Sequence, residues 1–60
     1  MSESDFYNMI YTIASKRVWS RNGIEVSTED DNIVIRLHDS IVAICFDVAE
    51  TKAIIDAIGL

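Results

Sequence analysis

The sequence contains no proline, and it has one cysteine, one histidine and two glycines in 60 residues. A single cysteine excludes an internal disulfide and any metal site built from several thiolates. The longest uninterrupted apolar run, residues 41–46, is too short to cross a bilayer. The first five residues include two acids and no base, unlike a secretory or transit peptide. We therefore expect a soluble protein of the cytoplasm.

The composition indicates one small folded domain over residues 1–60. Half of the residues are apolar and a quarter are charged, which is the balance of a globular chain. Ten acids against five bases give a net charge of −5, which disfavours general binding to nucleic acid or to anionic membranes. A chain this short buries only about 60% of its unfolded surface. We therefore expect a partner subunit or self-association to add stability.

The hydrophobic periodicity predicts five elements in the order helix, strand, strand, strand, helix. Ser2 or Ser4 is expected to cap the first helix, and Asp47 with Glu50 the last one. Asn22-Gly23 is interpreted as the stop after the first helix. The predicted ranges are a helix over residues 4–18, strands over 23–27, 33–38 and 41–48, and a helix from the Asp47 cap to Gly59.

These elements predict an α+β fold, a three-stranded antiparallel meander with both helices on its apolar face. A two-residue loop at Asp39-Ser40 would place Arg36 opposite Ala43 and Val34 opposite Cys45. This register separates the side chains of the two longer strands into an inner and an outer set. The inner set is Ile33, Ile35, Leu37, Val42, Ile44, Phe46 and Val48.

The predicted outer face is too apolar to lie entirely in water, so we interpret it as a dimer surface. The third predicted strand is also expected at the sheet edge, without the proline or lysine that usually protects an edge. A homodimer, formed by the edge or by the face, is the simplest way to cover both. The predicted dimer residues are Val34, Arg36, His38, Ile41, Ala43 and Cys45.

No combination of side chains predicts catalysis. In the predicted register, His38 and Cys45 lie roughly 13 Å apart along the hairpin, too far for a thiolate–imidazolium pair. Ser40, His38 and Asp39 are neighbours in one turn and cannot align as a catalytic triad. We therefore expect a protein that is not an enzyme and needs no cofactor.

Acidic residues are predicted to gather at one end of the sheet: Glu29, Asp30, Asp31, Asp47 and Glu50. Clustered oxygens can bind Ca²⁺ or Mg²⁺, but the 30–32 segment lacks the alternating ligands and glycine of an EF-hand loop, so no metal is predicted. A second interpretation is a solvated edge that only aids solubility. The third is a recognition surface for the arginines and lysines of a partner.

One short segment carries the opposite charge. Lys16, Arg17 and Arg21 surround Trp19, a combination that can stack on and grip a single nucleic-acid strand. Trp19 has a simpler interpretation, because tryptophan often closes the edge of a core or anchors an interface.

The leading hypothesis is a small acidic interaction protein that blocks a basic surface of another macromolecule. In size, acidity and lack of catalytic groups, the chain is similar as a class to phage-encoded inhibitors of host or defence proteins, including anti-CRISPR proteins. The alternatives are a structural or regulatory homo-oligomer without a nucleic-acid-related target, and a weak binder of single-stranded nucleic acid.

Overall fold

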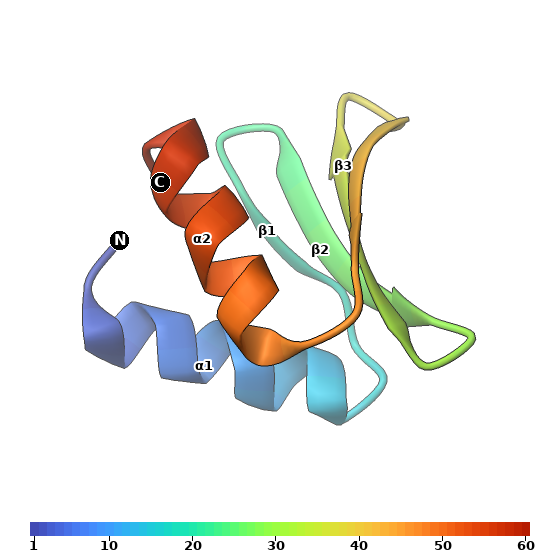
Figure 1. The fold of residues 1–60 in the computed structure, drawn as a ribbon, viewed down its shortest axis with the longest axis horizontal. Coiled ribbons are helices and arrows are strands. Elements are labelled where there is room, and N and C mark those ends of the chain that lie inside the picture. The colour runs from blue at the N-terminus through green and yellow to red at the C-terminus, as the bar shows by residue number, and fades with distance from the viewer.

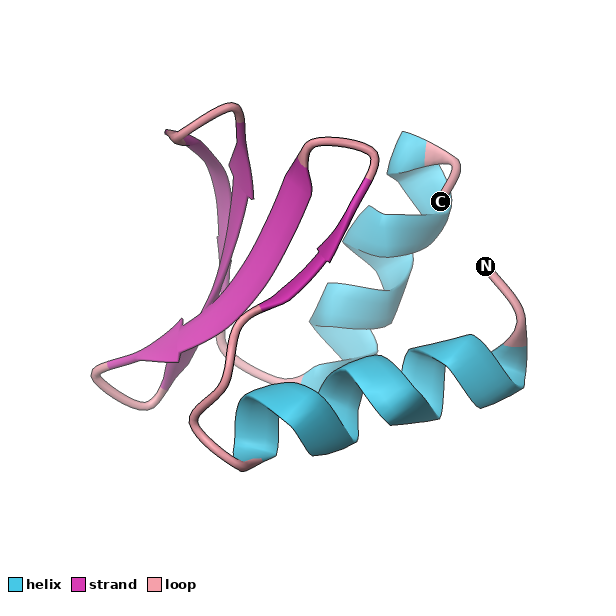
Figure 2. Cartoon of the chain, turned by 180° about the vertical axis from the view of Figure 1, so that it is seen from behind, coloured by secondary structure: helices cyan, strands magenta, loops and turns pink.

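The chain forms a four-stranded antiparallel sheet with both helices on one face, as Figures 1 and 2 show from opposite sides. The computed structural model describes residues 1–60. Each strand pairs with the one before it, so the sheet is a meander in the order β1-β2-β3-β4. The elements are α1 (Glu3–Ala14), β1 (Trp19–Arg21), β2 (Ile24–Glu29), β3 (Asn32–Leu37), β4 (Ser40–Cys45) and α2 (Val48–Ile58).

The predicted α+β class and the two helices are present, but the prediction of three strands is wrong. The residues between the predicted helix end at residue 18 and Asn22-Gly23, which were assigned to no strand, form β1, in which Trp19 pairs with Val26 and Arg21 with Ile24. Asn22-Gly23 is accordingly a hairpin turn and not a helix stop. The sheet therefore gains a short fourth strand at the edge opposite to β4.

α1 ends four residues before the predicted end because its last turn closes in a Schellman motif. The Lys16 N–H donates to the Ile13 carbonyl, and the Arg17 N–H donates to the Thr12 carbonyl. Lys16 has a φ of 64°, in the left-handed region where glycine is the usual residue. Because a lysine fills this position, the sequence carries no glycine signal for the end of the helix.

Three two-residue turns connect the four strands, and every central residue has a positive φ. The pairs are Asn22-Gly23, Asp30-Asp31 and His38-Asp39, with φ between 48° and 82°. Positive φ at both positions is the requirement of type I′ turns, whose twist matches that of paired strands. Asparagine and aspartate tolerate this backbone better than most residues, which explains the polar turns.

The register between β3 and β4 differs from the prediction. The turn is His38-Asp39, so Leu37 pairs with Ser40 and Arg36 with Ile41. Ile35 then pairs with Ala43, which leaves Val42 as the extra residue of a β-bulge. Beyond the bulge, the inward and outward positions of β4 are exchanged relative to the prediction. The predicted pairs Arg36–Ala43 and Val34–Cys45 are therefore wrong.

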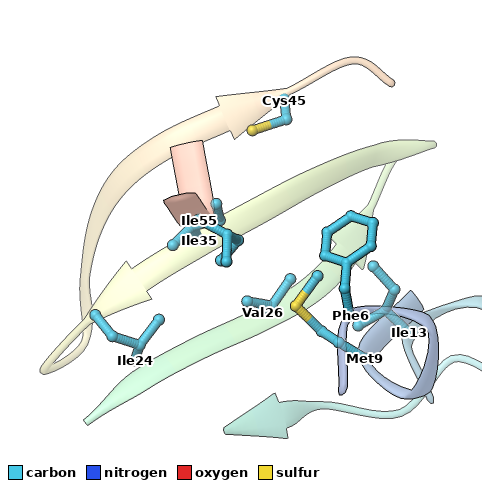
Figure 3. Packing of buried hydrophobic residues seen from close by; sticks show 8 residues of the cluster. All are labelled: Phe6, Met9, Ile13, Ile24, Val26, Ile35, Cys45 and Ile55. Carbon is cyan, nitrogen blue, oxygen red and sulfur yellow. The ribbon is translucent and has the colours of Figure 1, made fainter. Parts of the chain in front are cut away.

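The core lies between the inner face of the sheet and the two helices (Figure 3). α1 lies against β1 and β2, and α2 lies against β4. Thr51 of α2 is the one buried polar residue, and its hydroxyl donates to the Asp47 carbonyl at 2.8 Å. The buried apolar cluster consists of Phe6, Met9, Ile13, Ile24, Val26, Ile35, Cys45 and Ile55.

The predicted N-caps are confirmed at both helices. The Ser2 hydroxyl accepts from the Asp5 N–H at 3.1 Å, and an Asp47 carboxylate oxygen accepts from the Glu50 N–H at 2.7 Å. Gly59 ends α2 with a φ of 88°, and its N–H donates to the Asp56 carbonyl. Both helices thus begin with side-chain caps and end in left-handed residues.

Candidate functional site

Five apolar side chains are exposed along β4, just after it and at the start of α2. We call this set the edge patch: Ile41 (53% exposed), Val42 (49%), Ile44 (48%), Phe46 (71%) and Val48 (48%). β4 is the edge strand of the sheet, coloured yellow to orange in Figure 1. The bulge at Val42 produces the patch, because it turns Ala43 and Cys45 inward and Ile44 outward.

The six predicted dimer residues differ in exposure, and two of them are buried. Cys45 is completely buried in the core, and Ala43 is half-buried against it. Val34 lies on the outer face but is only 4% exposed. The other three predicted dimer residues remain accessible: Ile41 and His38 are exposed, and Arg36 is half-buried.

An ion pair explains why Val34 is buried on a face that no helix covers. In the register of β2 and β3, Glu25 lies opposite Arg36 and Glu29 lies opposite Asn32. The Ser27–Val34 pair lies midway between these two pairs. A guanidinium nitrogen of Arg36 nevertheless contacts a carboxylate oxygen of Glu29 at 2.6 Å. The two side chains therefore reach toward each other across the Val34 position.

The same hydrogen bond controls the titration of both groups. It holds the pKa of Glu29 below its ordinary value and raises the pKa of Arg36. Glu29 is thus committed to an internal contact. It is less free to meet a partner than Asp30 and Asp31, whereas Asp47 is also engaged, as the cap of α2.

Asp30 and Asp31 form the exposed tip of the β2–β3 hairpin, and neither makes an ion pair. Asp47 and Glu50 begin α2, and Ile33 pairs with Cys45 at the end of β4. The five acids therefore lie at one end of the sheet, as predicted. They are dispersed along it, since no three His, Cys, Asp or Glu residues come close enough to hold a metal ion.

The groups considered for catalysis are separated or occupied. His38 lies in the β3–β4 turn and Cys45 at the far end of β4. The His38 ring lies over Gly23, where an added Cβ would be 2.7 Å from its Cε1 atom. The surface contains no pocket. The structure thus brings no pair of these groups together around a cavity.

Trp19 closes the core at the opposite edge of the sheet. Its side chain is half-buried and packs against the core cluster. The Arg21 guanidinium lies 5.2 Å from the ring centroid, and Arg21 also pairs with Asp5 of α1 at 3.2 Å. Two of the four residues proposed to grip a single strand are therefore engaged within the molecule, whereas Lys16 and Arg17 are exposed and unpaired.

The predicted inner set wrongly included four members of the edge patch: Val42, Ile44, Phe46 and Val48. Every residue from 41 to 46 is apolar, so the alternation that normally distinguishes the two faces is absent. The shifted register between β3 and β4 therefore cannot be recognised from the pattern of apolar and polar residues. Only the polar turn residues His38 and Asp39 carried a signal, since both tolerate the backbone of a two-residue turn better than Ser40 does.

The chain matches no protein-family model, and neither curated proteins nor solved structures give a significant match. Neither helix combines the length and the apolar character needed to span a bilayer.

Proposed function

We propose that this chain is a small acidic interaction protein without catalytic activity, which inhibits a target by occupying its basic surface. The observation that carries the proposal is the β2–β3 hairpin tip. Asp30 and Asp31 are adjacent, exposed and free of internal cations. A two-residue turn holds their backbones, so little conformational freedom remains to be lost when a partner binds.

The charge of the whole chain supports a basic partner. Three of the five bases are paired with acids inside the molecule, Arg21, Arg36 and Lys52. The net charge of −5 attracts cationic surfaces over long range and raises the rate of encounter. A groove that normally binds nucleic acid presents such a surface. An acidic protein seated there excludes the nucleic acid, which is how phage-type inhibitors, including those directed at CRISPR systems, would act.

The test removes two charges without disturbing the fold. The Asp30→Asn, Asp31→Asn variant keeps residues that tolerate the left-handed backbone. The matched control, Glu3→Gln with Asp39→Asn, removes the same charge from exposed positions elsewhere. Proteins captured from the native host by the immobilised wild-type chain are identified by mass spectrometry, and the affinity of each captured target is then measured for all three proteins.

The proposal predicts a captured target that nucleic acid displaces. Loss of the tip charges should weaken its binding by roughly tenfold or more, and the control should change binding by less than about threefold. Capture of no target, equal weakening by both variants, or a target that nucleic acid does not displace would each contradict the proposal.

A second candidate function is a homo-oligomeric structural or regulatory module. The edge patch favours it, because monomeric proteins seldom leave an apolar edge strand uncovered. In this case the acids serve only solubility. A stable dimer that captures no basic target would support the second candidate against the first.

A further inference from the structure

The exposed apolar side chains of the molecule are concentrated in one segment. Ten large hydrophobic residues are exposed, and five of them are the edge patch. The others are distributed over α1, the loop before β1, the end of β3 and the end of α2. Phe46 is the most exposed aliphatic or phenyl side chain of all, at 71%. An exposed phenyl ring in a segment that exposes four further aliphatic side chains is typical of an interface.

The charge pattern identifies the partner. Residues 40–46 include four of the five edge-patch residues and carry no charge, in a chain with fifteen charged residues. Asp39 and Asp47 flank this stretch, and Asp47 separates Val48 from the rest of the edge patch. A basic partner finds no carboxylate within this stretch. Two copies of the chain repel each other over most of their surfaces, but their uncharged stretches can meet without opposing like charges.

The exposed area is also what a dimer of ordinary size requires. At the exposed fractions given above, the five residues present about 500 Å² of surface, toward the upper end of the ~300–600 Å² of the largest patches on monomers, which are often functional. A standard interface buries about 800 Å² per partner, of which roughly 65% is apolar in homodimers. The edge patch alone would supply nearly all of that apolar area.

We infer that a second copy of this chain covers the edge patch, so that the patch packs against itself in a two-fold homodimer. The bulge at Val42 interrupts the regular edge of β4, which disfavours a continuous sheet across the two copies. The contact is therefore made by side chains, with Phe46 as the central anchor and Ile41 and Ile44 beside it. This arrangement deepens the homo-oligomeric part of the proposed function and does not depend on the acidic tip.

The test is sedimentation equilibrium of the full chain over a range of concentrations. The variant Ile44→Ser, Phe46→Ser removes one aliphatic and one aromatic side chain from the edge patch. The matched control, Tyr11→Ser with Val18→Ser, makes the same change at exposed positions on α1 and in the following loop. Because all four side chains are exposed, circular dichroism should show the same fold for every protein.

We expect a wild-type dimer whose dissociation constant rises roughly 100-fold in the edge-patch variant and less than about threefold in the control. The Asp30→Asn, Asp31→Asn variant should remain dimeric, which separates this result from a failure of the basic-target proposal. A monomeric wild type, an undisturbed dimer in the edge-patch variant, or equal weakening by the control would overturn the inference.

A second measurement uses only the wild-type chain, in case the edge-patch variant fails to fold. In a sample that mixes labelled and unlabelled copies, isotope-filtered nuclear Overhauser effects report contacts between copies. They should connect the Phe46 ring with aliphatic protons of the edge patch in the other copy. Intermolecular effects confined to α1, or none at all, would contradict the arrangement.

Discussion

The two edges of the sheet are built differently. β1 is three residues long, lies against α1, and carries Arg21, which bridges from Trp19 to Asp5 of the helix. β4 is six residues long, carries no charge, and exposes Ile41, Val42 and Ile44. One edge is short and tied to a helix, whereas the other is long and apolar.

The difference shows how a small chain manages two edges with limited surface. α1 and α2 both pack on the inner face of the sheet, and the outer face has only side chains to cover it. The Arg36–Glu29 pair covers the outer face above Val34, in the β2–β3 half. No comparable pair lies over β4. The uncharged β4 edge is therefore accessible to a partner, and we propose that it is the binding edge.

The largest expected effect contrasts an aromatic residue from each edge. Trp19→Ala should lower the free energy of unfolding by about 2–3 kcal/mol, because the indole packs against the core and supports Arg21. Phe46→Ala should change the stability of the monomer by less than about 0.5 kcal/mol. Urea unfolding at a concentration where the chain is monomeric measures both. Equal decreases in the free energy of unfolding would mean that Phe46 stabilises the monomer as much as Trp19 does, which would contradict the proposed difference between the two edges.

The sequence predicts much of this fold where the local signals are strong. Ser2 and Asp47 are placed correctly as caps because their hydroxyl or carboxylate oxygens bond amides three residues away. The two longer hairpin strands are predicted because they are rich in β-branched residues. The acidic end of the sheet is also predicted, since it depends only on which strands are joined.

The remainder depends on tertiary structure. β1 is too short to show a period, and its pairing with β2 is what makes it a strand. The end of α1 lacks a glycine, and apolar residues occupy both faces of β4, so the bulge at Val42 has no sequence signal. That one extra residue moves Cys45 into the core and Ile44 out of it. The prediction that both faces of the sheet carry apolar side chains therefore places Cys45 and Ile44 on the wrong faces.

An intermediate effect concerns the turn that directs the chain from α1 into β1. Lys16→Gly should raise the free energy of unfolding by about 0.5–1 kcal/mol, because glycine adopts the left-handed backbone at lower energy. Gly59→Ala, at the equivalent end of α2, should lower it by about 1 kcal/mol. Thermal unfolding compares the two variants. A loss of stability in Lys16→Gly would show that the lysine side chain, and not its backbone, matters there.

The smallest effect concerns the ion pair on the outer face. Because the pKa of Glu29 is lowered in the folded state, its contribution is present above the unfolded pKa and is lost as the pH falls through the folded value. Glu29→Gln should therefore reduce the loss of stability between about pH 6 and pH 3. The difference should shrink in high salt, since both groups are accessible to solvent. An unchanged pH dependence would remove the pair as a stabilising contact.

A dilution series followed by amide chemical shifts tests whether β4 is the binding edge of the sheet. From about 1 mM to about 10 μM wild-type chain, we expect shift changes concentrated in residues 40–48 and almost none in residues 19–21. Shifts that stay constant over the whole range, or that change at β1 and α1 instead, would contradict this expectation.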